Sequence, residues 1–158
     1  MSPCRNALEQ RMEVFRDACK KAGIRVTPQR VEVFRQVACT EEHPDAETVF
    51  RRVRRRLTTV SLDTVYRTLD LLEDFGLISR VDVLCDRARF DANRERHHHF
   101  VCVRCGAVHD FVHPGWDRST VPEAVKAMGD VRSMHVQFRG LCSRCAAQER
   151  RGGKRPRS

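Results

Sequence analysis

Two Cys-x-x-Cys pairs restrict what the C-terminal third of this 158-residue chain can fold into. Cys102 and Cys105 form the first pair, and Cys142 and Cys145 form the second. Each pair can hold one ion from two sides, and Gly106 permits a tight turn after the first pair. Four thiolates in a tetrahedron are the ligand set of a structural Zn²⁺ site. The pattern predicts such a site. Rubredoxin-like iron for electron transfer is the alternative, and it would colour the protein.

Composition narrows the class of protein and its partners. Eight cysteines would indicate disulfides in a secreted protein, but metal or redox chemistry in a reducing compartment. The opening segment MSPCRNALEQRMEVF lacks the apolar core of a secretory signal, and no run approaches the ~18 apolar residues of a membrane span. We therefore expect a cytoplasmic protein without a membrane partner. The formal net charge of +9 favours a polyanionic partner, although a solvated basic surface is the simpler reading.

Apolar residues recur at helical spacing in three segments before residue 58. The first segment ends at Gly23. The second begins with Thr27 as N-cap and Pro28 in the first turn, and the third follows His43-Pro44. The outer face of the third predicted helix carries a run of arginines, which by default is a solvated face: Arg51, Arg52, Arg54, Arg55 and Arg56.

The segment SLDTVYRTLDLLEDFGLI predicts a fourth helix that has Ser61 as its N-cap and stops at Gly76. The exposed N-terminal half of this helix has side chains that can bond phosphates and base edges in a major groove. These candidate DNA-binding residues are Ser61, Asp63, Thr64, Tyr66 and Arg67. Alternating residues up to a Cys85-Asp86 turn and the returning RARFD then predict a hairpin. Helices followed by a hairpin favour a winged helix over an ordinary helical core.

The segment RHHHF (96–100) requires another explanation for its histidines. In a strand, His97 and His99 point to one face and His98 to the other. Asp110 lies in the next predicted strand, AVHDFV, and Asp91 ends the hairpin. Imidazoles with carboxylates suit Fe²⁺, Mn²⁺ or Zn²⁺. A catalytic metal site of a hydrolase has the same ligands, but no general base stands near them at a recognisable catalytic spacing.

Six ordered segments together resemble the ferric-uptake-regulator (Fur) family over about residues 10 to 147: TPQR, HPDAETVF, SLDTVYRTLDLLEDFGLI, RFD, HHHFVCVRCGAVHDF and CSRC. The resemblance implies an α/β (α+β) protein with a winged-helix DNA-binding domain over residues 1–90. A small α/β dimerisation and metal-binding domain would follow over 91–148, and a disordered basic tail over 149–158. It also implies a homodimer that binds a palindromic double-stranded DNA operator as a transcriptional repressor, and not an enzyme.

The resemblance also assigns the metal ligands. The four cysteines match the family's structural zinc site. The regulatory site, for Fe²⁺ or Mn²⁺, would take His43, Asp91, His97, His99 and Asp110. A further site of many members would need His98, Asp117 and Met134. Methionine is a poor ligand for a hard metal, so we expect this further site to be absent.

Asp110 decides between branches of the family, because most iron and zinc sensors have Glu at this position. Aspartate resembles the peroxide-responsive branch, as does the segment DFVHPGWD. The resemblance then implies that peroxide is the signal and no other small molecule is a substrate. Iron-dependent oxidation would modify the ligand histidines His43 or His97 and release DNA. An iron- or zinc-responsive repressor of the same family is the alternative.

Overall fold

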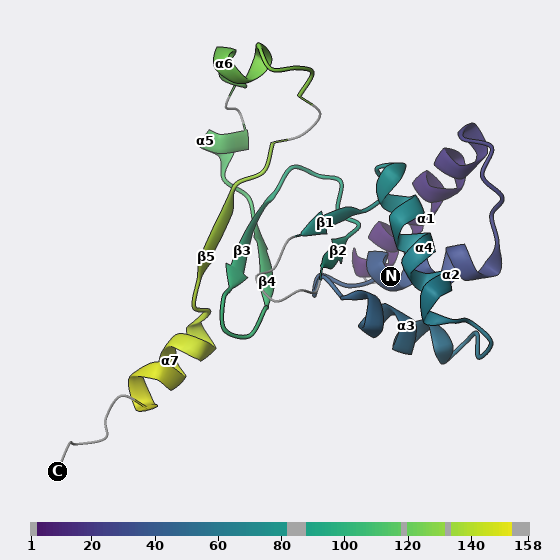
Figure 1. Ribbon diagram of the computed structural model, residues 1–158, viewed down its shortest axis with the longest axis horizontal. Coiled ribbons are helices and arrows are strands. Elements are labelled where there is room, and N and C mark those ends of the chain that lie inside the picture. Colours follow the sequence, from purple (N-terminus) through teal and green to yellow (C-terminus); the bar gives the residue numbers. More distant parts are fainter. Residues whose placement is uncertain (1–2, 82–87, 118–119, 132–133, 153–158) are drawn as a thin grey trace. The chain divides into compact units, whose positions relative to one another are not determined.

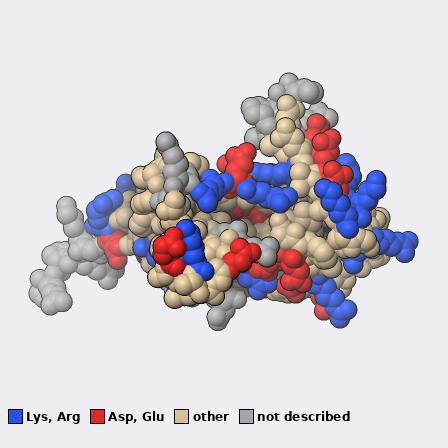
Figure 2. Space-filling model, turned by 90° about the horizontal axis from the view of Figure 1, so that it is seen from above, with Lys and Arg blue, Asp and Glu red and all other residues tan. Residues whose placement is uncertain are grey.

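The computed structural model describes residues 3–81, 88–117, 120–131 and 134–152. The chain forms two compact units, residues 1–94 and 95–158, each with its own elements (Figure 1). Lys and Arg side chains are spread over the face seen in Figure 2, with Asp and Glu among them. None of the described helices is long and apolar enough to cross a membrane.

The first unit begins with four helices: α1 (Pro3–Lys21), α2 (Pro28–Ala38), α3 (Ala46–Arg54) and α4 (Leu62–Asp74). The predicted N-caps are confirmed, because Thr27 Oγ1 accepts from the Arg30 amide at 3.3 Å and Ser61 Oγ from the Thr64 amide at 3.1 Å. Asp45 caps α3 in the same way. These side chains satisfy amides that have no partner within their helix.

The apolar stripes of the four helices meet in one core. Phe15 of α1 stacks on Phe34 of α2 with ring centroids 4.8 Å apart. Cys19 is 1% exposed in this core, and burial raises the pKa of its thiol. Leu69 and Leu72 of α4 are also fully buried in this core.

A short hairpin follows the helices. Strands β1 (Ser79–Val81) and β2 (Arg89–Asp91) pair antiparallel, with Ser79 opposite Asp91. The predicted Cys85-Asp86 turn lies outside the described residues. Helices α2 to α4 and the hairpin have the element order of a winged helix. The first unit runs to Arg94, four residues past the predicted limit, and Asp91 still belongs to β2.

The second unit contains a three-stranded sheet in the order β4-β3-β5. The strands are β3 (His98–Cys102), β4 (Val108–Phe111) and β5 (Gln137–Gly140). β3 and β4 pair antiparallel, whereas β5 runs parallel to β3, so the chain must cross over between β4 and β5. The short helices α5 (Pro114–Asp117) and α6 (Glu123–Lys126) lie on this crossover.

The last helix, α7 (Ser143–Gly152), corrects the expectation of a disordered tail from residue 149. Its sequence, SRCAAQERRG, is rich in helix-forming residues, and Arg150 and Arg151 in the last turn favour the helix dipole. Residues 153–158 lie outside the described part.

Candidate metal centres and nucleic-acid interface

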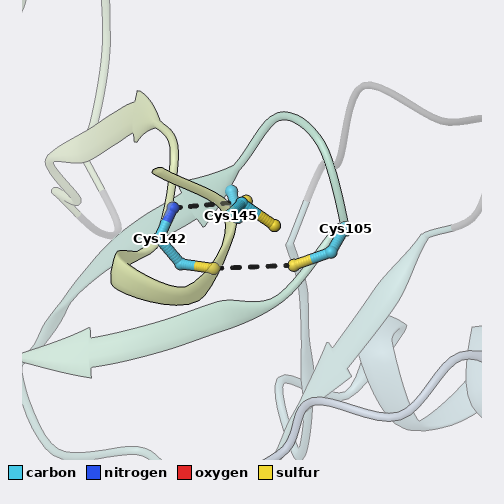
Figure 3. A group of neighbouring side chains, drawn as sticks. Cys105, Cys142 and Cys145 are labelled. Carbon is cyan, nitrogen blue, oxygen red and sulfur yellow. Dashed lines mark hydrogen bonds between the residues drawn. The ribbon is translucent and has the colours of Figure 1, made fainter. Parts of the chain in front are cut away.

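The four cysteines come together at one end of the sheet in the second unit. Their sulfur atoms all lie within 4.8 Å of one another, as the prediction of one shared site requires. Cys105 Sγ and Cys142 Sγ are 3.8 Å apart (Figure 3). With Zn–S bonds of ~2.3 Å, the edge of a ZnS₄ tetrahedron is also ~3.8 Å. The residues therefore fit tetrahedral zinc.

Backbone amides prepare one of these sulfurs to be a thiolate. The Cys142 amide donates to Cys102 Sγ at 3.3 Å. This amide, with those of Cys105 and Arg104, lowers the pKa of Cys102 to about 6 although the side chain is buried. Burial and the neighbouring thiols instead raise the pKa of Cys145 to about 12. A metal ion would be needed to deprotonate all four, because coordination removes the thiol proton.

In the first unit, the His43-Pro44 turn is tied to strand β2. Arg89 Nη1 donates to the His43 carbonyl at 3.2 Å, and the Phe90 amide to the Pro44 carbonyl at 3.1 Å. These bonds hold His43 at a φ of 49°. Among the described residues, no other residue except glycine has a positive φ. Such a backbone costs on the order of 1 kcal/mol, and strain of this kind is concentrated at functional positions.

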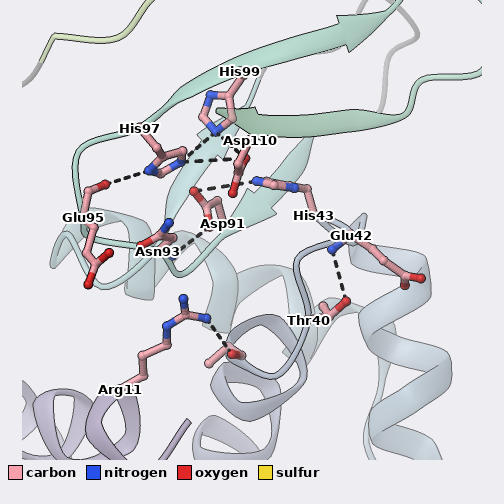
Figure 4. Close-up of polar contacts among 11 residues, drawn as sticks. Arg11, Thr40, Glu42, His43, Asp91, Asn93, Glu95, His97, His99 and Asp110 are labelled. Carbon is pink, nitrogen blue, oxygen red and sulfur yellow. Dashed lines mark hydrogen bonds and ion pairs between the residues drawn. The ribbon is translucent and has the colours of Figure 1, made fainter. Parts of the chain in front are cut away.

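The turn brings the His43 imidazole to Asp91. His43 Nε2 lies 3.8 Å from Asp91 Oδ2, and both side chains are buried (Figure 4). The Asn93 amide donates to Asp91 Oδ1 at 2.7 Å and so fixes the carboxylate. The structure thus pairs two of the five predicted regulatory ligands within the first unit.

The other three predicted ligands converge in the second unit. His97 Nε2 lies 2.9 Å from His99 Nε2, and Asp110 Oδ1 lies 3.5 Å from His99 Nε2 and 4.0 Å from His97 Nε2 (Figure 4). Strand register explains the arrangement, since His99 on β3 stands opposite Asp110 on β4. Separations of about 3 to 4 Å are those between ligands that share a cation at ~2.1 Å. The donor set fits a divalent metal.

The His97 ring is oriented by the chain next to it. Its Nδ1 atom lies 2.7 Å from the Glu95 carbonyl oxygen, a contact that places a proton on Nδ1 when the ring is neutral. Nε2 is then left as the electron-pair donor, facing His99 and Asp110. Metal-binding histidines are commonly fixed by a contact of this kind at the second nitrogen.

His98 points to the opposite face of β3, as predicted. Its ring is fully buried, with ring centroids 5.5 Å from Phe111 and 5.6 Å from Trp116. The Val136 amide donates to His98 Nδ1 at 3.2 Å. Aromatic packing and a backbone bond therefore surround the side chain that the further metal site would need.

His135 was left without a role by the sequence. Its exposed ring lies 6.2 Å, between centroids, from the rings of both His97 and His99. The reason is the parallel register that sets Gln137 beside His99, because His135 comes two residues earlier on that side. No pattern in the sequence indicated that β5 would pair in this direction.

The predicted DNA-binding side chains in the N-terminal half of α4 are of two kinds, those that bond to the helix start and those that are exposed. Ser61 and Thr64 bond to each other at 2.8 Å, and Ser61 also caps the helix. Tyr66 is 45% exposed, and the Arg67 side chain is 80% exposed. Arg67 Nε contacts Asp63 Oδ2 at 3.0 Å, a surface ion pair that is easily exchanged for a phosphate or base. Tyr66 and Arg67 are therefore the side chains available for contact.

Comparison with known proteins decides the family. The model of the ferric uptake regulator family matches residues 21–137, which is most of the chain. The chain belongs to the ferric uptake regulator family. Its helices and small sheets form an α+β fold, which it shares with solved members of this family.

Relatives of this Fur-family chain include regulators with different signals. The peroxide-responsive repressor PerR of Staphylococcus epidermidis is 27% identical over 145 residues, covering 92% of this chain and 97% of that protein. The structure of the ferric uptake regulator of Helicobacter pylori is 26% identical, with a TM-score of 0.72 and coverage of 88% and 93%. The peroxide stress regulator of Campylobacter jejuni is 26% identical, with a TM-score of 0.64 and coverage of 84% and 97%.

Proposed function

We propose that this Fur-family regulator is a metal-dependent repressor that responds to peroxide. The observation that carries the proposal is the cluster of His97, His99 and Asp110, in which a divalent metal fits and aspartate is the carboxylate. Similarity to a peroxide-responsive repressor over 92% of the chain supports the same signal. The protein would act by binding DNA, without catalytic turnover.

The regulatory metal would join the two units. His43 and Asp91 would contribute from the first unit, and His97, His99 and Asp110 from the second. A metal bound to both sets of side chains would stabilise one arrangement of the DNA-binding units in a homodimer. Only an arrangement that matches the spacing of a palindromic operator binds it tightly, so metal and DNA would favour the same conformation.

The metals implied are zinc at the four cysteines and Fe²⁺ or Mn²⁺ at the regulatory residues. Bound Fe²⁺ would supply one-electron reduction of peroxide, which Mn²⁺ supplies far less readily. The imidazoles of His43 and His97 are the ligand side chains that we expect to gain an oxygen atom. An oxidised ring loses the nitrogen lone pair that donates to the metal, and His43 would then no longer connect the first unit to the second.

DNA contact is assigned to the start of α4. Arg67 can form two parallel hydrogen bonds with guanine, and Tyr66 can contact a phosphate or a base edge. Asp63 would release Arg67 when DNA binds, while Ser61 and Thr64 hold the helix end in place through their cap.

An iron- or zinc-responsive repressor is the second candidate, favoured by the likeness to the Helicobacter pylori ferric uptake regulator. One experiment separates the candidates. A duplex selected from a random library by the Mn²⁺ form is titrated with the apo, Mn²⁺, Fe²⁺ and Zn²⁺ forms, each with and without peroxide. The peroxide proposal expects release from the Fe²⁺ form alone. Binding by the Fe²⁺ form that survives peroxide would favour the second candidate.

A further inference from the structure

Among the described residues, arginines line a cavity in the first unit and no carboxylate does. It has a volume of about 410 Å³ and lies between the C-terminal ends of α2 and α3. Arg35 lines it from α2, and Arg52, Arg55 and Arg56 line it from α3 and the turn that follows. The remaining lining residues are uncharged and can donate hydrogen bonds: Gln36, Cys39 and Thr40. None of them belongs to a metal site or to α4.

Carboxylates that contact the lining arginines neutralise only part of this charge. Glu32 binds Arg35 through two hydrogen bonds of 2.6 and 3.0 Å, and its contact with Arg56 is a long 3.9 Å. Glu42 contacts Arg52 at 2.7 Å. Among the described residues, Arg55 has no ion pair. Four guanidinium groups against these two carboxylates leave a net charge of +2 around the cavity.

The Glu32 contacts also hold the cavity in shape. Burial raises the pKa of Glu32, but bonds from Arg35 and Gln36 and the charges of Arg35 and Arg56 outweigh it, and the net pKa lies below its usual range. Glu32 is therefore ionised at neutral pH and fixes Arg35 in place. A fixed guanidinium loses little entropy when it binds a second anion.

We propose that this cavity binds phosphate groups. Guanidinium groups donate paired hydrogen bonds that match the geometry of phosphate oxygens, and the cavity volume is within the range of small-ligand sites. Either of two sources can present a phosphate. A free diphosphate would occupy the cavity itself, while a DNA backbone could reach Arg55 and Arg56, which lie only a few residues before the start of α4. The inference does not rest on the metal or the peroxide signal.

Cys39 provides a reporter, because its thiol is exposed and lines the cavity. The full-length, zinc-loaded protein is treated with the neutral reagent iodoacetamide, and alkylation of the peptide with Cys39 is followed by mass spectrometry. Inorganic pyrophosphate should slow this alkylation. R55Q should need about tenfold more pyrophosphate for the same protection, since a charge-assisted hydrogen bond is lost.

R51Q is the matched control. Arg51 is exposed on α3, donates to Thr48 Oγ1 at 2.9 Å and does not line the cavity, so R51Q removes the same charge elsewhere. We expect pyrophosphate to protect Cys39 in R51Q as well as it does in the protein without substitutions. R51Q and R55Q could lose protection of Cys39 equally while both keep the melting temperature of the protein without substitutions. That result would mean general charge attraction and would overturn the proposal. Absence of protection by either pyrophosphate or DNA would also overturn it.

A second arm distinguishes the two sources of phosphate. A duplex of unrelated sequence and the selected operator replace pyrophosphate in the same assay. The DNA backbone is the source if the duplex protects Cys39 while pyrophosphate has no effect, and if R55Q weakens that protection. Protection by pyrophosphate alone identifies a free phosphate ligand. Operator binding by the Mn²⁺ form is measured in a separate assay. A failure of the repressor proposal can therefore be distinguished from a failure of the phosphate-site proposal.

Discussion

The Nε2 atoms of His97 and His99 lie 2.9 Å apart. At this distance the two nitrogen lone pairs can donate to one shared cation. Asp110, 3.5 Å from the His99 nitrogen, adds the negative charge that a cation requires. The second unit alone therefore offers three ligand groups, and the first unit adds His43 and Asp91 in the proposed complete site.

His43→Ala should abolish Mn²⁺-dependent operator binding while zinc remains at the cysteines. The variant removes the imidazole that connects the first unit to the proposed site, but leaves His97, His99 and Asp110 in place. Gel shifts over a Mn²⁺ titration, with zinc measured by atomic absorption, check the outcome. His109→Ala is the control, since this exposed histidine belongs to no predicted ligand set. Full activation of His43→Ala at ordinary Mn²⁺ concentrations would remove His43 from the site.

Cys142→Ser should remove the proposed zinc and either unfold the second unit or dissociate the proposed dimer. Three thiolates bind zinc more weakly than four, and the core beside them is small, with Phe100, Ala107 and Leu141 packed against the cysteines. Zinc content, circular dichroism and size-exclusion chromatography measure the change. Cys39→Ser, at an exposed cysteine, should alter none of them. A zinc-free Cys142→Ser protein that remains a folded dimer would contradict the structural role.

Arg67→Ala should weaken specific DNA binding by ~1–3 kcal/mol and leave the fold intact. The side chain is 80% exposed and its ion pair with Asp63 lies on the surface, so little stability depends on it. Fluorescence anisotropy with operator and with unrelated duplex separates specific from general binding. Arg51→Ala removes an equal charge from α3 as a control. Unchanged specificity in Arg67→Ala would shift the reading surface away from α4.

Mild peroxide should add oxygen to a peptide that contains His43 or His97 in the Fe²⁺ form only. An oxidant produced beside its ligands reacts with the nearest electron-rich ring before it diffuses away. Tandem mass spectrometry locates the added oxygen, and the Mn²⁺ form is the matched control. Asp110→Glu should reduce the modification, because a longer carboxylate would change the open coordination position at which the iron meets peroxide. Oxidation of the four cysteines before any histidine would refute the peroxide-sensor proposal.

Sequence patterns among nearby residues predicted the helices of the first unit well. The spacing of apolar residues and the caps at Thr27 and Ser61 identified the helices, because helix starts depend on contacts within a few residues. Strand alternation also separated His98 from its neighbours. The family resemblance, and not spacing, supplied His43 and Asp91 as partners. The structure confirms that these two lie together within one unit, while the regulatory set as a whole stays a prediction.

The second unit was less accessible to the sequence. Strand β5 pairs with β3 across a connection of more than thirty residues, and no local signal specifies such a register. The position of His135 beside His97 and His99 follows from that pairing. Helix α7 was missed because its arginines and Gly152 were read as part of a charged tail, although its centre favours a helix.

The hydrogen bond from the Cys142 amide to Cys102 Sγ joins positions 40 residues apart in the chain. Closing so long a loop is entropically unfavourable, and a folding chain gains few contacts before the loop has closed. If zinc joins the two pairs, its capture becomes an early step in maturation of the second unit. Newly made chains would then compete for zinc as they fold, and scarcity of zinc would limit how many mature molecules a cell can assemble.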